Sequence, residues 1–451
     1  MSVPFKSKLE IEGSGPPLSP LPPFPEKLKG GWRFALPAIL ALYLLFAVLH
    51  ANLFPMGQRG YQNAPDEPAH LSYIEVVREG RLPSLKEPGP RAPSDLSYET
   101  YEWHQPPLYY VLATPFRIVS ERAVRFLSIL IGLGCITLIF EATRWLIPRQ
   151  PMAAILAAGC AALTPGHIAI TSVVNNDGLL EFFFSAWALA IIHSLNGGFT
   201  PVRARWVGVV IGGALLTKAT AVLLLPLTAF TLFLMWRNGE SKTNLIRGAA
   251  WVASVATCLS GWWFLRNLQL YHELLPLKAF LDSFGGTAQA SDAVAGSLMP
   301  DVSGWGSYLV RVAEWTFKSF WSVYGTRQSA AIGAPRFLPA PLYQLAGVAM
   351  AVVAAGMTRL HLRRRQEFNQ TQLYSLWILF AMLGLVGVVF AKFNLTYFQA
   401  QGRYFYPAMA PICVCISLGW RSVFPERYKT IASVFLLGFL CAFCVAFLRI
   451  L

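Results

Sequence analysis

The sequence has few charged residues, and it lacks the signatures of nucleotide-dependent enzymes. Asp, Glu, Lys and Arg make up 13% of the 451 residues, roughly half the share that is usual in a globular domain. Neither a Walker A motif nor a G-x-G-x-x-G fingerprint occurs in the chain. The composition excludes a disordered, collagenous or disulfide-rich protein, and we expect a reaction that does not use a nucleotide-binding domain.

Metal and redox signals are also scarce. The seven cysteines lie in apolar stretches, including Cys413-Val414-Cys415 and Cys441-Ala442-Phe443-Cys444. We interpret them as buried apolar side chains, because no polar residues accompany them. No His-x-His or His-x-x-x-His pair occurs. We therefore predict that no cofactor is required, with a divalent metal held by His and acidic residues as an alternative.

Long apolar runs dominate the chain instead. Hydrophobic residues make up 55% of it, and a helix needs about 20 apolar residues to cross the hydrocarbon of a bilayer. The candidate spans are residues 33–54, 123–146, 151–171, 178–195, 205–217, 219–236, 246–265, 338–358, 372–391, 404–420 and 430–448. We predict an all-α polytopic membrane protein with about 11 transmembrane helices. Residues 1–32 would form a disordered cytoplasmic tail, and residues 33–451 a single transmembrane domain.

The positions of the charges predict the orientation. The net charge is +14, with 37 basic and 23 acidic residues. Segments on the same side as the N-terminus carry 19 of the basic and seven of the acidic residues, so the positive-inside rule places the N-terminus in the cytoplasm and, after eleven spans, the C-terminus outside. Two long loops, residues 55–122 and 266–337, then lie on the outer face. Their aromatic segments 103–116 and 305–321 predict helices in the membrane interface.

The sharpest polar motif lies in the first outer loop, where Asp66 and Glu67 precede His70. Adjacent carboxylates followed by a histidine are a plausible general base with an orienting partner. A structural interpretation also fits, since Asp66 can cap a helix that begins at Glu67 or Pro68. The two interpretations are compatible.

Two further segments face the same side. His104 and Gln105 lie in the run Trp103–Tyr110, which can serve as an interfacial anchor or bind substrate. Asn176 and Asp177 lie between the third and fourth spans, where an ordinary turn and helix cap is the simplest explanation. Asp177 would nevertheless face the same compartment as Asp66.

Three cations stand at predicted outer borders, where the positive-inside rule does not expect them. They are Lys218, Arg266 and Arg403. A cation at that depth is costly unless it has a partner, which makes it a functional candidate. A lipid phosphate is the natural partner, since Arg binds it bidentately and Lys binds it as a point charge. The alternative is snorkelling, or pairing with an acid such as Asp177.

Taken in order, the motifs resemble those of the GT-C superfamily of membrane glycosyltransferases, in particular bacterial relatives of protein O-mannosyltransferases and of lipid A aminoarabinose transferases. The resemblance covers roughly residues 33–420. The segments that carry it are Pro65–His70, Gln105–Tyr110, Asn175–Gly178, Leu216–Thr220, Trp262–Asn267 with Tyr271, and Gln401–Tyr404.

The resemblance implies an inverting transfer of a sugar from a polyprenyl phosphate to an acceptor hydroxyl, on the outer face of the bacterial inner (plasma) membrane. Asp66 would be the base and Glu67 a supporting carboxylate. The cations Lys218, Arg266 and Arg403 would hold the lipid phosphate. The substrate-site candidates are His70, His104, Gln105, Asn176, Asp177 and Tyr404. The partners would be a polyprenyl phosphate and an acceptor protein, lipid or glycan, without nucleic acid.

Two other functions are compatible with the sequence. A transporter or flippase of a lipid-linked sugar also needs many spans and buried cations, but transporters usually contain internal repeats and charges at the membrane midplane. We find no repeat, and the charged candidates gather at one face. A non-catalytic partner in envelope glycan assembly is the third possibility.

Overall fold

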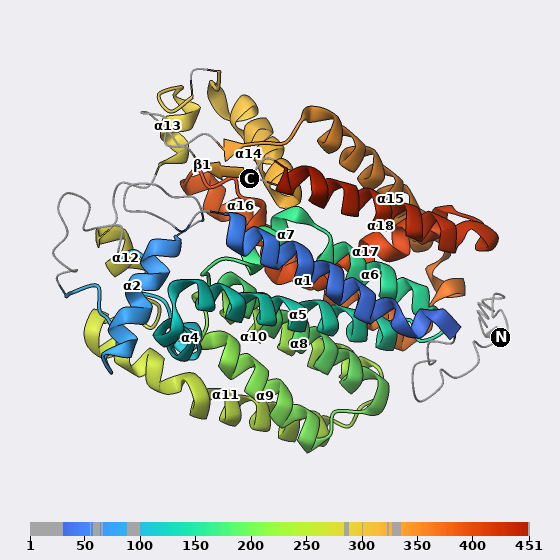
Figure 1. Ribbon diagram of the computed structural model, residues 1–451. Coiled ribbons are helices and arrows are strands. Elements are labelled where there is room, and N and C mark those ends of the chain that lie inside the picture. The colour runs from blue at the N-terminus through green and yellow to red at the C-terminus, as the bar shows by residue number, and fades with distance from the viewer. Residues whose placement is uncertain are drawn as a thin grey trace, which may run out of the picture.

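The computed structural model describes residues 30–54, 56, 64, 66–87, 100–283, 288–299, 301–322, 324–326 and 335–449. Within these ranges the chain is almost entirely helical, and its long helices form one bundle (Figure 1). The predicted tail at residues 1–32 falls mostly outside the described residues.

Eight helices in the described part of the chain are long and apolar enough to cross a membrane. They are Trp32–Leu53 (the end of η1, Gly30–Phe34, with α1, Ala35–Leu53), α5 (Glu121–Leu146), α8 (Asp177–Gly197), η2 with α10 (Ala219–Leu223 and Leu224–Arg237), α11 (Lys242–Tyr271), α15 (Ala340–Glu367), α16 (Gln370–Thr396) and α18 (Glu426–Leu448). The pair α6 (Pro151–Ala162) and α7 (Pro165–Thr171) is bent by 64° and counts as a ninth crossing if it is one span. The predicted all-α polytopic membrane protein is confirmed.

The predicted number of eleven spans is not confirmed. Two of the predicted stretches form helices of only 15 residues, α9 (Pro201–Leu215) and α17 (Met409–Val423). At 1.5 Å per residue such a helix is roughly 22 Å long, which is less than the hydrocarbon thickness of about 30 Å. The turn that follows α9 and the 3-10 helix η3 (Gly402–Ala408) that precedes α17 both contribute to the candidate site.

Small residues allow the central helices to approach one another closely. In α6, every residue from Ala153 to Ala162 is buried. At the contact of α15 with α17, a Cβ atom on Gly356 would lie 1.9 Å from the carbonyl oxygen of Gly419. Glycine is therefore required at position 356, because the backbones of the two helices touch there.

The shorter elements gather at one end of the bundle (Figure 1). They are α2 (Glu67–Arg78), α4 (Leu108–Val119), α12 (Leu277–Ser283), α13 (Ala290–Val294), α14 (Gly304–Trp321) and the antiparallel pair β1 (Tyr324–Thr326) and β2 (Pro335–Arg336). They belong to the two predicted outer loops. Helices predicted within residues 103–116 and 305–321 are present as α4 and α14, and α14 exposes the apolar side chains of Trp305, Leu309 and Val310.

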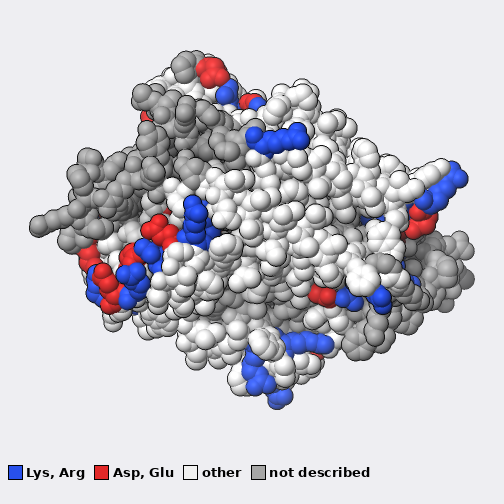
Figure 2. All heavy atoms as spheres, viewed as in Figure 1, with Lys and Arg blue, Asp and Glu red and all other residues white. Residues whose placement is uncertain are grey.

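Charged side chains are unevenly distributed over the surface. Figure 2 shows a broad uncharged area across the middle of the visible face, with most Lys, Arg, Asp and Glu towards its margins. Many large apolar side chains are exposed on the long helices, among them Leu45, Phe233, Val348 and Phe435. A surface of this kind suits lipid rather than water, and the chain is a multi-pass membrane protein.

Candidate active site

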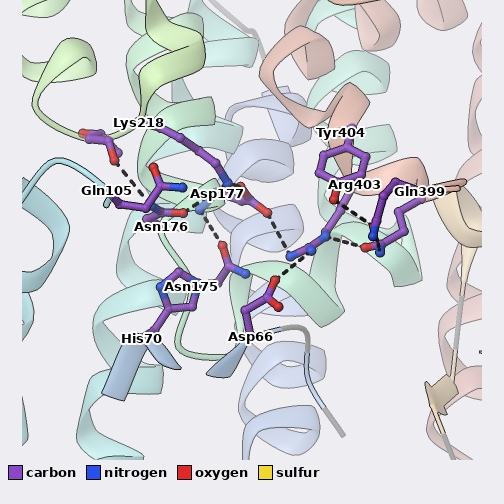
Figure 3. A network of polar contacts seen from close by, with 12 residues as sticks. Asp66, His70, Gln105, Asn175, Asn176, Asp177, Lys218, Gln399, Arg403 and Tyr404 are labelled. Carbon is purple, nitrogen blue, oxygen red and sulfur yellow. Dashed lines mark hydrogen bonds and ion pairs between the residues drawn. The ribbon is translucent and has the colours of Figure 1, made fainter. Parts of the chain in front are cut away.

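Four charged side chains from distant parts of the sequence meet at the end of the bundle where the short helices gather (Figure 3). Asp66 directly precedes α2, and Asp177 is the first residue of α8. Lys218 lies between α9 and η2, and Arg403 is the second residue of η3. We call these four residues the charge cluster. The sequence predicted each of them as a site residue.

Arg403 joins the two aspartates. Its Nη2 donates to Asp66 Oδ2 at 2.9 Å, and its Nη1 donates to Asp177 Oδ2 at 3.4 Å. Gln401 Oε1 accepts from Nε at 2.7 Å, and the guanidinium lies over the ring of Tyr404, 5.3 Å from its centroid. The planar group is thus held in one orientation, which suits recognition of an anion.

Lys218 completes the cluster from the opposite side of Asp177. Its Nζ lies 2.5 Å from Asp177 Oδ1 and 3.3 Å from Asn176 Oδ1. Asn176 in turn donates to the carbonyl oxygen of Thr217 at 3.3 Å, so α8 and the turn at Lys218 are fixed to each other. Burial alone would lower the pKa of Lys218, but the acidic groups of Asp177 and Glu102 together outweigh it and raise that pKa. Lys218 is therefore a cation at neutral pH.

The backbone of Asp66 separates the capping interpretation from the functional one. Asp66 occupies the N-cap position of α2, yet its side chain makes no capping hydrogen bond. Its φ angle is +59°, in the left-handed region that residues other than glycine rarely adopt. The carboxylate turns to Arg403 instead of the helix N-terminus. A non-glycine residue in this conformation is typical of functional sites.

Asp177 also directs its side chain away from helix capping. The backbone N–H of Asp177 donates to Asn175 Oδ1 at 2.7 Å, which closes a local turn at the start of α8. The N-cap residue itself, Asn176, makes no capping bond with its side chain. Both carboxylate oxygens of Asp177 are engaged by the cations of the charge cluster. The predicted turn is thus present, and Asp177 belongs to the same site as Asp66.

Glu67 has a different environment from its neighbour. Its two oxygens accept from Arg125 Nε and Nη2 at 2.8 and 2.6 Å, and Oε1 also accepts from the backbone N–H of Val174 at 2.9 Å. Both side chains are almost fully buried. Arg125 also donates to the carbonyl oxygens of Ala51 and Phe54. Glu67 therefore ties the start of α2 to α1, α5 and the segment before α8.

Among the described residues, Arg266 makes no hydrogen bond or ion pair with the charge cluster. Its Nη2 donates to the carbonyl oxygens of Leu82 and Pro83 at 3.1 and 2.7 Å, and its guanidinium lies over the ring of Trp263. The side chain holds the loop after α2 against the end of α11. We grouped Arg266 with Lys218 and Arg403 in the sequence because all three lie at the ends of predicted spans. A position at a span end does not determine which side chains contact one another.

The two predicted histidines are neutral. His70 Nδ1 lies 3.0 Å from the hydroxyl of Tyr110, and burial lowers the pKa of His70 to about 3. His104 donates from Nδ1 to the carbonyl oxygen of Tyr101, and burial lowers its pKa to about 4. His104 Nε2 then accepts from Gln105 Nε2 at 3.0 Å. Neither ring reaches the charge cluster through a hydrogen bond among the described residues.

Tyr404 follows Arg403 in η3. Its hydroxyl donates to Gln399 Oε1 at 3.3 Å, and burial raises the pKa of the hydroxyl. Gln399 also accepts from Gln401, whose Oε1 binds Arg403. Tyr404 and the two glutamines therefore hold Arg403 in place.

The structure adds Glu102 to the predicted residues. This carboxyl is buried in the segment before α4, and burial together with the charges of Asp66 and Asp177 raises its pKa to about 8, against the opposing effect of Lys218 and Arg403. Nothing in the sequence around Tyr101-Glu102-Trp103 distinguished it. Arg125 was also missed, although a cation inside the apolar run 123–146 carries the signal that identified Lys218.

An apolar pocket of about 470 Å³ adjoins η3. Its lining comes from α14, α15, α16, η3 and α17 and includes Phe317, Phe320, Phe390, Phe405 and Ile412. Phe405 lies two residues after Arg403, and its ring packs on Phe390 at a centroid distance of 4.9 Å. A hydrocarbon chain would thus find an apolar surface close to the charge cluster.

A metal site is not evident in the described part of the chain. No group of three or more His, Cys, Asp or Glu side chains there is arranged to hold a metal ion. The aspartates of the charge cluster are instead engaged by Lys218 and Arg403.

Comparison with known proteins gives a family match over just over a third of the chain. Residues 104–263 match the dolichyl-phosphate-mannose-protein mannosyltransferase family. This segment contains Lys218 and Asp177 but neither Asp66 nor Arg403. No curated protein sequence matches the chain.

Solved structures are similar over most of the chain. ArnT from Cupriavidus metallidurans bound to undecaprenyl phosphate has a TM-score of 0.53 at 14% identity, with 88% of this chain and 61% of ArnT covered. The Archaeoglobus fulgidus oligosaccharyltransferase tethered to an acceptor peptide has a TM-score of 0.52 at 14% identity, with 91% and 55% covered. The same archaeal enzyme, AglB, in complex with an inhibitory peptide and a dolichol-phosphate, has a TM-score of 0.50 at 13% identity, with 92% and 56% covered.

The chain spans between about half and three fifths of the length of these structures. The fold that this resemblance implies is confirmed. The chain has the fold of the GT-C superfamily of membrane glycosyltransferases.

Proposed function

We propose that this protein is an inverting glycosyltransferase that moves a sugar from a polyprenyl phosphate to an acceptor hydroxyl on the outer face of the bacterial inner membrane. The observation that carries the proposal is the charge cluster beside an apolar pocket. An amphipathic anion such as a lipid phosphate needs both features at once. The structures of ArnT and AglB that contain undecaprenyl phosphate and dolichol-phosphate support this class of ligand.

The charges within the charge cluster balance one another. Two cations face two carboxylates, and the side chains of all four are less than one fifth exposed. A phosphate entering the cluster replaces the carboxylates as the partner of Lys218 and Arg403. Arg403 offers two parallel N–H groups and Lys218 a point charge, which together match a phosphodiester.

The same exchange prepares the base. When the phosphate binds Arg403, that guanidinium no longer neutralises the carboxylate of Asp66, which then accepts a proton from the acceptor hydroxyl. The acceptor oxygen forms a bond with the anomeric carbon of the sugar, and the bond from that carbon to the phosphate oxygen breaks with inversion. The leaving polyprenyl phosphate gains negative charge, which Lys218 and Arg403 stabilise.

The other predicted residues support this arrangement. Glu67 acts as a supporting carboxylate by fixing the start of α2 through Arg125, and Asn176 positions Lys218. The proposal requires no cofactor. Arg266 is left out of the phosphate site, because its guanidinium hydrogen-bonds the backbone at Leu82 and Pro83.

The test is release of polyprenyl phosphate by the purified protein in lipid nanodiscs. Polyprenyl-phosphate sugars are supplied with peptide, glycan or lipid acceptors, and free polyprenyl phosphate is measured with and without each acceptor. We expect acceptor-dependent release by the wild-type chain and none by Asp66→Asn. Movement of intact donor between leaflets in proteoliposomes without release would favour a flippase, and neither activity would favour a non-catalytic partner.

A further inference from the structure

Two buried side-chain oxygen atoms in the segment before α4 have no hydrogen-bond partner in the part of the chain that the structure describes. Glu102 is 4% exposed and Gln105 is 7% exposed. Glu102 Oε2 and Gln105 Oε1 have no hydrogen-bond partner among the described residues. Leaving a buried polar atom unpaired destabilises the folded state, so two in one short segment point to a ligand that pairs with them.

The segment that carries these atoms is fixed at both ends. On one side, Trp103 Nε1 donates to Ser72 Oγ at 3.3 Å, and the Tyr73 hydroxyl donates to the carbonyl oxygen of Gln105 at 3.0 Å. On the other side, the Leu108 N–H donates to the carbonyl oxygen of Leu216 at 2.8 Å, two residues before Lys218. The segment therefore lies between α2, whose N-cap is Asp66, and the turn that presents Lys218.

We infer that Glu102 and Gln105 form the subsite for the transferred sugar, and that they bind a neutral sugar through its hydroxyl groups. This inference rests on the proposed function. The position suits it, because a sugar linked to a phosphate held by Lys218 and Arg403 must lie within one ring of that phosphate and reach Asp66 with its anomeric carbon. The backbone bond from Leu108 to Leu216 holds the segment next to the turn that presents Lys218.

The protonation state of Glu102 supports a neutral sugar as the ligand. With a pKa of about 8, its carboxyl is neutral at pH 7 and offers one O–H donor as well as an acceptor. A hydroxyl group on a sugar has the same pair of functions. A bound phosphate adds negative charge to the site and makes ionisation of Glu102 still less favourable. A sugar that carries a positive charge would need the ionised carboxylate instead.

The experiment compares the binding of undecaprenyl phosphate with that of undecaprenyl phosphate bearing mannose, glucose, arabinose or an amino pentose. Dissociation constants are measured in nanodiscs for wild type, Glu102→Ala, Glu102→Gln and Gln105→Ala. The control is Ser185→Ala, which removes another buried oxygen without a partner, two turns into α8 and outside the subsite.

In the wild type, we expect undecaprenyl phosphate that bears at least one of the neutral sugars to bind more tightly than undecaprenyl phosphate alone. We call the ratio of the two dissociation constants the gain. Glu102→Ala and Gln105→Ala should each reduce that gain by about 2- to 10-fold, the range for a neutral hydrogen bond, and should leave binding of the bare lipid unchanged. Glu102→Gln should retain most of the gain, because an amide resembles a neutral carboxyl. In the wild type the gain should fall above pH 8 as Glu102 ionises, and in Glu102→Gln it should not.

Each contrary result overturns a different claim. Failure of the wild type to bind undecaprenyl phosphate at all overturns the proposed function. Normal binding of the bare lipid with no gain from any sugar, or an equal loss for bare and sugar-bearing lipid in Glu102→Ala, overturns only the subsite. A gain confined to the amino pentose and abolished by Glu102→Gln overturns the neutral sugar.

Discussion

Two neighbouring acids at the start of α2 form ion pairs of opposite character. Asp66 pairs with Arg403 through one oxygen, at a position where the carboxylate keeps 17% of its surface exposed. Glu67 pairs with Arg125 through both oxygens in a fully buried position. The backbone N–H of Val174 also donates to Glu67, and Arg125 also donates to the carbonyl oxygens of Ala51 in α1 and of Phe54 directly after it. The two adjacent acids thus differ in side-chain exposure and in the number of hydrogen bonds that hold the partner. These two properties determine whether a ligand can displace that partner.

The difference shows how one short motif can serve two purposes. A buried pair whose hydrogen-bonding capacity is used internally has nothing to offer a substrate, and breaking it leaves an uncompensated charge. A partly exposed pair in a balanced group of four charges can exchange its partner for a phosphate at little cost. Four substitutions test this contrast.

Asp66→Asn should have the largest effect on activity. Loss of a general base typically costs about 10²–10⁴-fold in rate, and asparagine tolerates the left-handed backbone of this position, so the variant should fold. The measurement is acceptor-dependent release of polyprenyl phosphate, with size-exclusion chromatography to confirm folding. Wild-type activity in a folded Asp66→Asn protein would remove Asp66 from the mechanism.

Glu67→Gln should chiefly affect stability. Removal of one partner from a buried ion pair costs about 3–5 kcal/mol, because Arg125 is then left without its counter-charge. We expect a marked fall in the midpoint of thermal aggregation in detergent, with Asp66→Asn as the matched control that changes little. Equal stability of the two variants would contradict the contrast between the two pairs.

Arg403→Ala should weaken binding of the donor. Hydrogen bonds to charged groups contribute about 1.5–3 kcal/mol, which corresponds to roughly 10- to 150-fold in the dissociation constant of undecaprenyl phosphate. The loss should become smaller at high ionic strength, where the wild-type interaction is screened. An unchanged donor requirement would remove Arg403 from the phosphate site.

Arg266→Ala should have the smallest effect on the donor. Its guanidinium binds the carbonyl oxygens of Leu82 and Pro83, so the substitution should loosen the loop after α2 and alter the dissociation constant of undecaprenyl phosphate by no more than about 2-fold. Isothermal titration beside Arg403→Ala makes the comparison direct. A loss as large as that of Arg403→Ala would restore Arg266 to the phosphate site.

Much of the fold could be predicted from apolar periodicity and length, since crossing a bilayer demands long apolar helices whatever they pack against. The short helices α9 and α17 could not be predicted as short, because their apolar runs continue into the turn after α9 and into η3 before α17. The first and last residues of these helices depend on packing against other parts of the chain. A run of apolar residues does not specify that packing.

Part of the site could be predicted from the sequence, because a charged residue in an apolar run is costly unless it has a partner. This criterion singled out Lys218 and Arg403, which meet at Asp177, and also Arg266, which does not join them. It could not distinguish the three, because pairing is decided by the tertiary arrangement. Glu102 could not be identified from the sequence for another reason. Its raised pKa arises from burial and from charged residues that are distant in the sequence.

The positive φ angle of Asp66 limits how position 66 can vary. Most side chains would strain the backbone there, so a complete set of substitutions would lose most of its members to misfolding before their chemistry could be judged. Asparagine and glycine should survive, and glycine, which adopts positive φ without steric cost, should even gain stability while it loses the carboxylate. A heat-resistant but inactive Asp66→Gly protein would show that the local backbone tolerates strain to keep an acid in this place.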